Sequence, residues 1–506
     1  ILSEMLSQGK IDQEEYDAAV AEDIQFANGF TISGKYVGSD GTGTEPDTED
    51  TTDTSDDTAS PADDSTPTIK GSNSWFTDAM ITDVAEALVE KLGITEKVNS
   101  EGKKVSAYDQ AINMVYSRGY KIYTTQNPKY QKIAEDVCYN LENIPYTSSY
   151  TNAAGEQVED QLQIALTIVD PTNGYVVAMI GGAGEKVVDR GWNWAVNARQ
   201  CGSAIKPLSV YAPALDAGVI TPASVIDDYP VEMLGGSIWP VNAYSGYRGM
   251  MTLQDAIRNS SNPTAVRTAI KLTLPASYAF MTENLSFSTL TNDDLTAAGA
   301  LALGGLSKGV TTREMAAAYA SFARGGIYTT PRTYTEVRDH NGNVILDNKS
   351  ESHVAMEEST AYSMNELLKN VVRNGTGTGA NFSGMTIAGK TGSTNSNNDR
   401  YFVGYTPYYT AAVWVGYDTP TRIVASGNPA ATLWKTFMSK VHEGLPNKDF
   451  DVGSGDMVSV TVCTQTGLLA SSGCPAQTVK VAKDYAPKLS CDAHISVTVC
   501  ADSGML

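Results

Sequence analysis

The sequence predicts an α+β domain whose first and last strands share one sheet, with helices packed around it. Two apolar segments, 162–170 and 175–182, are separated by Pro-Thr-Asn-Gly, a strong turn signal. Three more strand-like segments follow at 386–393, 401–406 and 408–418. The stretch between the two groups has mainly helical periodicity, so the strands at both ends are expected to pair around a helical middle.

Length and composition set the scale of the chain. Its 506 residues include 42% hydrophobic and 19% charged residues, which is typical of a folded protein. About 150 residues per domain would suggest roughly three domains. No apolar run approaches the roughly 18 residues of a membrane-spanning helix. Changes in composition place the expected boundaries at 1–36, 37–72, 73–160, 161–447 and 450–506.

Much of the negative charge is local. The chain has 36 Lys and Arg against 58 Asp and Glu, a net charge of −22. Ten of the acidic residues lie between Asp40 and Asp64, in a segment without basic residues and nearly without apolar ones. Such a segment cannot bury enough surface to fold, so 37–72 is predicted to be a disordered insertion. The acidic balance also argues against nucleic-acid binding, which requires a basic face.

Helix signals mark the other elements in order. Residues 1–22 are predicted to form two short helices, the second opened by the capping box that begins at Asp12. An approximate apolar stripe predicts a helix at 75–92, and a short strand at 121–125 precedes another helix. A further helix is expected from Ser203 to just before Gly218. The Thr311-x-x-Glu314 capping box opens another, which ends at Gly325-Gly326.

Four of the six cysteines are concentrated near the end of the chain. They are separated by 10, 16 and 8 residues, without the closely spaced cysteine pair typical of a zinc site. We therefore expect no metal here but two disulfides in an oxidising compartment, with three pairings open. The disulfide candidates are Cys463, Cys474, Cys491 and Cys500. Cys138 and Cys201 are expected to be buried, either inert or paired with each other.

One motif match is misleading. Residues 384–391 satisfy the GxxxxGK[ST] pattern of phosphate-binding loops. That chemistry needs a buried strand before the loop and a helix after it. The flanks are polar and rich in Gly, Asn and Ser, so a nucleotide site is not expected, and no cofactor is predicted.

Three short motifs carry the chemistry. Ser203-x-x-Lys206 opens an apolar helix, which places a nucleophile and a base on one face. Ser260-x-Asn262 follows another helical segment. Lys390-Thr391-Gly392-Ser393 ends a strand, where the lysine and hydroxyls could hold a carboxylate and the glycine would let a substrate backbone approach. Each pattern alone is common, and Ser363 with Asn365 also matches the second, but their order is that of penicillin-binding proteins and serine β-lactamases.

The chain resembles the transpeptidase portion of a class A, bifunctional penicillin-binding protein from a Gram-positive bacterium. The resemblance covers about 161–420 through blocks such as RQCGSAIKPLSVYAPALDAG, RNSSNPTAV and AGKTGSTNSNNDRYFVGYTP. It implies an antiparallel sheet flanked by helices, a linker or pedestal domain at 73–160 and the transpeptidase domain at 161–447. A small disulfide-bonded β-like module is expected at 450–506. Residues 1–36 resemble the end of the family's glycosyltransferase domain and the start of the linker, with the membrane anchor expected upstream.

The resemblance also implies roles for the motif residues. Ser203 would be the acylated nucleophile, Lys206 its proton acceptor and Ser260 the carrier of that proton to the leaving amine. Asn262 would position Lys206 and the substrate amide. Lys390 would keep Lys206 deprotonated, and Thr391 and Ser393 would hold the terminal carboxylate of a D-Ala-D-Ala stem peptide. The backbone N–H groups of Ser203 and Ser393 would form the oxyanion hole.

The implied function is peptidoglycan D,D-transpeptidation through a serine acyl-enzyme that β-lactams also form. The expected partners are stem peptides as D-Ala-D-Ala donor and amine acceptor, β-lactam antibiotics and other cell-wall synthesis proteins, on the extracellular face of the cytoplasmic membrane. Glycosyltransferase activity would belong to the full-length protein only. A D,D-carboxypeptidase, a serine β-lactamase and a non-catalytic β-lactam or cell-wall sensor remain open as alternatives. Cys201 and Ser393 depart from the family's usual Pro and Thr at those positions.

Overall fold

The computed structural model describes residues 73–99, 102–151, 157–453 and 456–494, together with two short strands near the N-terminus. The chain divides into two compact units, 1–68 and 69–506. In the first unit, β1 (Ile24–Gln25) pairs antiparallel with β2 (Thr31–Ile32). The predicted helices within 1–22 and the acidic insertion at 37–72 lie outside the described residues.

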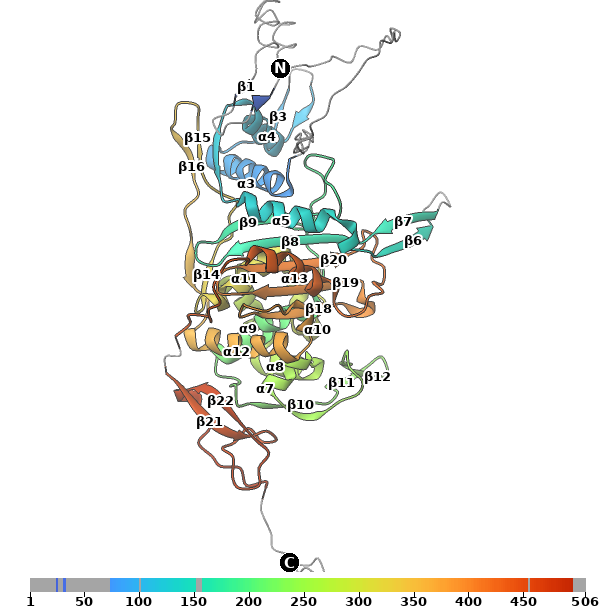
Figure 1. Ribbon diagram of the computed structural model, residues 1–506, viewed down its shortest axis with the longest axis vertical. Helices are drawn as coiled ribbons and strands as arrows, with labels where there is room; N and C mark the ends of the chain where they lie inside the picture. The colour runs from blue at the N-terminus through green and yellow to red at the C-terminus, as the bar shows by residue number, and fades with distance from the viewer. Residues whose placement is uncertain are drawn as a thin grey trace, which may run out of the picture. The chain divides into compact units, whose positions relative to one another are not determined.

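A five-stranded antiparallel sheet forms the centre of the second unit (Figure 1). Its order is β18-β19-β20-β8-β9, so the late strands pair with the early ones, as the sequence predicts. β20 pairs with β8 along its whole length, with Trp414 opposite Ala165. β18 is the strand at one edge. The bounds are β8 Gln163–Asp170, β9 Tyr175–Ile180, β18 Ala388–Ser393, β19 Asp399–Tyr405 and β20 Thr410–Gly416.

Both faces of this sheet are buried because successive side chains of each strand enter two different hydrophobic cores. Ala165, Val403 and Trp414 pack into the core that contains α11 (Thr312–Ala323). Their neighbours in sequence pack into the core that contains α5 (Pro128–Tyr139) and α13 (Pro429–Val441). α11 begins with the predicted capping box, in which Thr311 and Glu314 bond each other's backbone N–H groups.

A helical region on the β18 side carries two of the three motifs. The predicted continuous helix after Ser203 is three segments: the 3₁₀ turn η2 (Gly202–Ile205), the π turn η3 (Pro207–Tyr211) and α6 (Ala212–Asp216). Pro207 and Pro213 lack the N–H groups that a continuous α-helix requires, which explains the breaks. The other helices here are α7 Leu253–Asn259, α8 Asn262–Leu272, α9 Leu274–Ala279, α10 Ala298–Leu303 and α12 Glu358–Asn374, with the short turns η4 Phe280–Asn284, η5 Asn292–Leu295 and η6 Thr378–Ala380.

Small hairpins and paired strands surround the helical region and the edges of the fold. β10 (Val225–Asp228) pairs with β13 (Gly249–Thr252), and β11 (Glu232–Leu234) pairs with β12 (Ser237–Trp239). The other strands are β3 Lys97–Val98, β4 Lys104–Val105, β6 Thr147–Thr151, β7 Gln157–Gln161, β14 Ile327–Thr329 and β17 Ser352–Val354. Two further 3₁₀ turns are η1 Leu141–Asn143 and η7 Asn395–Asn397.

The region at 73–160 contributes one strand to a second sheet, which is separate from the central one. The predicted helix at 75–92 is confirmed as α3 (Trp75–Leu92), capped by Ser74 and by Gly93 in the left-handed conformation. It packs beside α4 (Ala107–Ser117). β5 (Lys121–Thr124) adds to β15 (Tyr334–Arg338) and β16 (Val344–Asp347) in a three-stranded sheet. The expected boundaries at 160/161 and 447/450 stay predictions.

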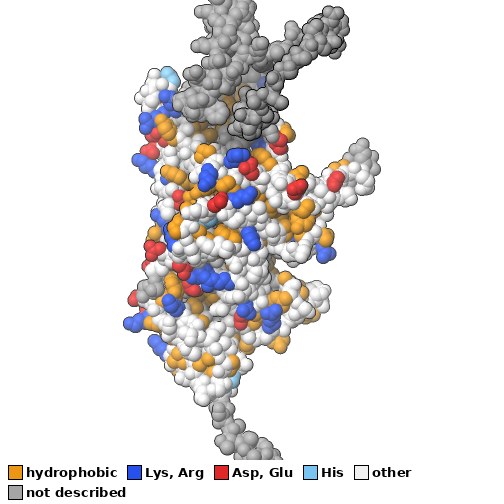
Figure 2. Space-filling model, in the orientation of Figure 1, with side chains coloured by type: hydrophobic (Ala, Val, Ile, Leu, Met, Phe, Trp, Pro, Cys, Tyr) orange, Lys and Arg blue, Asp and Glu red, His pale blue; other side chains and the backbone are white. Residues whose placement is uncertain are grey.

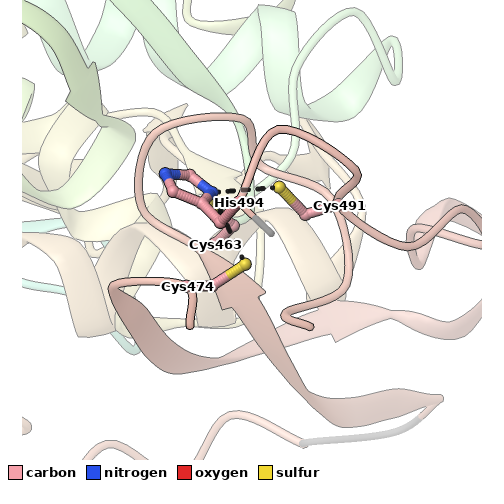
Figure 3. Close-up of side chains that lie close together, drawn as sticks. All are labelled: Cys463, Cys474, Cys491 and His494. Carbon is pink, nitrogen blue, oxygen red and sulfur yellow. Dashed lines mark hydrogen bonds between the residues drawn. The ribbon is translucent and has the colours of Figure 1, made fainter. Parts of the chain in front are cut away.

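The C-terminal module is a hairpin of β21 (Met457–Cys463) and β22 (Ala476–Ala482), followed by the 3₁₀ turn η8 (Lys483–Tyr485). The predicted disulfides are wrong for the cysteines that the structure describes, since Cys463, Cys474 and Cys491 are all free thiols. Their sulfur atoms gather instead around the ring of His494 (Figure 3). The cysteine spacings alone did not predict this group, because its fourth member is a histidine three residues after Cys491. Cys500 lies outside the described residues.

Two other cysteines and the surface complete the description. Cys138 and Cys201 are free and fully buried, so they do not pair with each other, and burial raises the pKa of both thiols.

On the face seen in Figure 2, Lys and Arg side chains are interspersed with Asp and Glu. Among the described residues, no helix has both the length and the apolarity to cross a membrane.

Candidate active site

The nucleophile candidate Ser203 lies on the 3₁₀ turn η2, pressed against strand β18. Gly202 has a φ of 51°, and a β-carbon there would collide with the carbonyl oxygen of Ser393. The Tyr319 hydroxyl donates to the Ala204 carbonyl at 2.6 Å and holds the turn from the other side. Ser203 is partly exposed between buried neighbours. The turn therefore presents one accessible hydroxyl on a closely packed support.

Lys206 follows one turn later, and its backbone N–H donates to the Ser203 carbonyl. Its side chain is completely buried. Nζ donates to Asn262 Oδ1 at 2.7 Å and lies 2.9 Å from the Ser260 carbonyl and 3.1 Å from the Ser261 carbonyl. The structure therefore brings the first two motifs together at the lysine amine.

The second motif lies where two helices meet. Ser260 ends α7 with a φ of 60°, an uncommon conformation for a residue other than glycine, and Asn262 begins α8. Asn262 is fixed by a bond from its Nδ2 to the Val241 carbonyl at 2.6 Å. The tight turn directs Ser260 Oγ toward both lysines, 3.4 Å from Lys206 Nζ and 2.9 Å from Lys390 Nζ.

The third motif occupies edge strand β18. Lys390 is completely buried and also bonds the Thr391 carbonyl at 3.1 Å. Thr391 donates to Thr376 at 2.7 Å, and Arg400 on β19 donates to Ser393 Oγ at 3.0 Å. Gly392 has a clear role in packing, because a β-carbon there would collide with the Cys201 carbonyl oxygen. Gly389–Thr391 lie within strand β18 and so do not form the loop before a helix that a phosphate-binding site requires. The GxxxxGK[ST] match at 384–391 is therefore not a nucleotide site.

Burial lowers the pKa of both active-site lysines. Burial, reinforced by the nearby charge of Lys390, lowers the pKa of Lys206 well below its usual value, while the Asp228 carboxylate opposes this shift. Burial also lowers the pKa of Lys390 to about 7. The lower pKa favours the neutral amine of Lys206, which is the form that can accept a proton from a serine hydroxyl.

Sequence reasoning missed Asp228, which organises the region around the second motif. This buried carboxylate accepts from Ser261 Oγ at 2.6 Å, from the Tyr244 hydroxyl at 2.8 Å and from Asn242 Nδ2 at 3.0 Å. No local pattern marks it, because its partners come from distant segments. It holds the Ser260–Asn262 turn against the β10 and β13 strands.

A second feature that the sequence analysis did not predict is the anchor that holds the chain segment before Ser203. Arg199 donates through Nε and Nη2 to Asp399 Oδ1 at 3.1 and 3.0 Å, and its guanidinium lies over the rings of Trp194 and Trp414. Trp414 Nε1 also donates to Asp399 at 2.9 Å. The segment before Ser203 is thereby anchored to strands β19 and β20.

A cleft of about 800 Å³ lies beside the three motifs, and Arg199 and Asp399 are among the residues that line it. Its lining includes one residue from each motif region, Gly202, Asn262 and Ser393, and also Trp239 and Pro240. A peptide could extend there beside edge strand β18. None of the cleft residues belongs to the group of described side chains that are spaced to hold a metal ion. That group consists of Cys463, Cys474, Cys491 and His494.

Comparisons with known proteins agree with this geometry. The family described as "Penicillin binding protein transpeptidase domain" matches residues 164–438. Penicillin-binding protein 1A of Clostridium acetobutylicum is 33% identical over 399 residues, which cover 76% of this chain and 47% of that protein. Penicillin-binding protein 1A of Clostridium tetani is 33% identical over 450 residues, 84% of this chain and 54% of that protein. The chain thus spans about half the length of these relatives.

Solved structures share the fold. Penicillin-binding protein 1A from Haemophilus influenzae superposes with a TM-score of 0.64 at 20% identity, covering 97% of this chain and 82% of that one. PonA1 from Mycobacterium tuberculosis, in complex with penicillin V, gives a TM-score of 0.58 at 22% identity, covering 74% of this chain and 95% of that one. The expected fold is confirmed. With a family match over more than half of its length, the chain belongs to the penicillin-binding protein transpeptidase family, as a relative of the class A proteins of the 1A type.

Proposed function

We propose that this domain is a serine D,D-transpeptidase that cross-links peptidoglycan stem peptides and is acylated by β-lactams at the same serine. The observation that carries the proposal is the buried array in which Lys206 bonds Asn262 while Ser260 Oγ lies within reach of both Lys206 and Lys390. This array supplies a base one turn after the nucleophile in the chain, together with a hydroxyl path along which the proton can leave.

In the proposed acylation, neutral Lys206 accepts the proton of Ser203 as the Ser203 oxygen attacks the carbonyl of the penultimate D-Ala. The oxyanion that forms is stabilised by the backbone N–H groups of Ser203 and Ser393. The peptide C–N bond then breaks, and the leaving D-Ala amine receives the proton through Ser260. In the second step the amine of an acceptor stem peptide attacks the ester, the bond between the acyl carbon and the Ser203 oxygen breaks, and Ser203 receives the proton that the attacking amine loses. A β-lactam follows the first step, with its ring amide bond broken.

The terminal carboxylate of the donor is proposed to bind at the end of β18. Thr391 and Ser393 offer hydroxyls there, and Lys390 offers a buried cation. Arg400 adds a guanidinium that donates to Ser393 Oγ, and its Nε is a buried nitrogen without a hydrogen-bond partner among the described residues. A carboxylate beside Ser393 would satisfy that nitrogen through a charge-assisted bond.

The proposal extends to the whole protein by resemblance. We place it on the extracellular face of the cytoplasmic membrane, where peptidoglycan lies, with cell-wall synthesis proteins as further partners. Glycosyltransferase activity is assigned to the full-length protein only.

The fate of the acyl-enzyme tests the proposal. The chain is incubated with a D-Ala-D-Ala pentapeptide donor and an amine acceptor, and products are resolved by mass spectrometry. We expect cross-linked dimer, loss of D-Ala, and a penicillin adduct that decays slowly. Hydrolysed donor without dimer would indicate a carboxypeptidase, and rapid turnover of penicillin a β-lactamase. A stable adduct with no reaction of the donor would indicate a sensor.

A further inference from the structure

Three cysteines and a histidine meet in the C-terminal module (Figure 3). Cys463 ends β21, Cys474 lies in the hairpin loop before β22, and Cys491 and His494 follow the hairpin. The ligand atoms of all four lie within 4.8 Å of one another. We propose that this group is a structural zinc site of the Cys3His type, independent of the reaction at Ser203.

The distances fit a metal better than hydrogen bonds. His494 Nδ1 lies 3.6 Å from the sulfur of Cys463, 3.6 Å from that of Cys474 and 3.3 Å from that of Cys491. One ring nitrogen carries one proton or one lone pair, so it cannot satisfy three sulfur atoms. Tetrahedral zinc, with Zn–S near 2.3 Å and Zn–N near 2.0–2.1 Å, separates sulfur from nitrogen by about 3.5 Å.

The surroundings of the four side chains suit thiolate ligands. His494 Nε2 lies 2.8 Å from Gln465 Oε1, which would accept its proton and leave Nδ1 free for the metal. The backbone N–H groups of Gln465 and Ser471 point at the sulfurs of Cys463 and Cys474, at 3.5 and 3.3 Å. Such donors stabilise the negative charge of a coordinated thiolate.

The module also needs a cross-link. Among the described residues, its fully buried hydrophobic cluster consists of Val462 and Val481 with Ala223 from outside the module, and four partly buried residues pack against it: Val458, Val460, Val479 and Ala486. A core of that size does not stabilise a fold of about 50 residues, and small domains compensate with disulfides or metals. Its three described cysteines are free thiols, so a metal is the cross-link that the geometry allows. Binding would release the three thiol protons as Zn²⁺ joins three sulfurs and one imidazole nitrogen.

The test measures metal on the full chain. Protein is loaded with zinc, dialysed against a competing chelator and assayed for zinc and for penicillin acylation, which reports on the fold of the catalytic domain. We expect one zinc per wild-type chain and at least tenfold weaker retention in Cys474→Ser and His494→Ala, with acylation unchanged. The matched controls Cys138→Ala and His340→Ala, and Cys500→Ser, are expected to retain zinc.

Two further measurements need no variant. Cobalt-loaded wild-type protein should show the intense visible bands of tetrahedral cobalt with thiolate ligands. Non-reducing chymotryptic mapping, which separates Cys463 from Cys474 at Leu468 and Leu469, should find these thiols unlinked. The assignment would be overturned if wild-type protein retained no zinc, or if zinc were lost in Cys500→Ser but not in His494→Ala. It would also be overturned by a cobalt spectrum without thiolate bands, or by a disulfide between any two of Cys463, Cys474 and Cys491.

Discussion

Lys206 and Lys390 meet at one oxygen atom, the Oγ of Ser260, which lies 3.4 Å from the first amine and 2.9 Å from the second. Both lysines are completely buried, and within the part of the chain that the structure describes neither has a carboxylate as its hydrogen-bond partner. Two ammonium groups so close together in a buried site are unfavourable, so the proton count of the pair is held low. The site is therefore prepared to accept a proton.

Removing the shared hydroxyl should slow acylation. In Ser260→Ala, the path from Lys206 to the leaving group is lost while both lysines stay in place, so we expect the penicillin acylation rate to fall roughly 100-fold. Stopped-flow labelling with a fluorescent penicillin measures this rate. The control is Ser363→Ala, because Ser363 also precedes an Asn by two residues but bonds the Ser359 carbonyl within α12. Equal rates for the two variants would contradict the role of Ser260.

Removing the Lys390 charge should shift the pH profile. Lys206 must be neutral to act, so acylation falls as pH drops through its pKa. Lys390 contributes to lowering that pKa, and Lys390→Ala therefore raises it. The acid limb of the profile should move to higher pH, in addition to a loss of rate from weaker carboxylate binding. Acylation rates between pH 5 and 10 show the shift; a lower rate with an unmoved limb would count against the electrostatic role.

The Arg199 anchor should matter for stability and for rate. Arg199→Lys keeps the charge but loses the two-pronged bond to Asp399 and the stacking on Trp194 and Trp414. We expect a loss of about 2 kcal/mol in the free energy of unfolding and slower acylation, because the nucleophile segment follows directly. Urea denaturation and penicillin labelling measure the two effects. Arg338→Lys is the control, because its pair with Glu336 is more exposed, at 40% and 24% of the two side chains against 13% and 8% for Arg199 and Asp399, and should contribute less.

Gly392 should tolerate no side chain. In Gly392→Ala the added carbon meets the Cys201 carbonyl oxygen, so β18 and the nucleophile turn must separate. We expect at least a tenfold slower acylation with a destabilisation of about 1–3 kcal/mol. Gly379→Ala is the matched control, since an added carbon there has only ordinary contacts, the nearest at 3.7 Å. Acylation by Gly392→Ala at the control's rate would refute the close packing inferred here.

The sheet was predictable because its signals are local. Residues 163–170 and 410–416 are mostly apolar runs, and a strand buried on both faces requires such a run. The α11 start was equally clear, since a capping box involves only four residues. The broken helix after Ser203 was missed because the apolar pattern continues through Pro207 and Pro213, and only hydrogen-bond geometry separates a π turn from an α-helix.

Within the site, the motif residues were predictable and their supports were not. Ser203, Lys206 and Lys390 belong to short patterns, but Asp228 and Arg199 act through partners far along the chain. The cysteine cluster was misread because its fourth member is a histidine. Cys491-x-x-His494 is a metal-ligand spacing that a search including histidine would have found.

The most direct test of the proposed mechanism is the site of acylation. Wild-type chain and Ser203→Ala are incubated with penicillin, and the intact masses and the peptide containing residue 203 are measured. We predict a single adduct on wild type, located on Ser203, and none on the variant. An adduct of equal yield on Ser203→Ala, or one located on another residue, would contradict the assignment of the nucleophile.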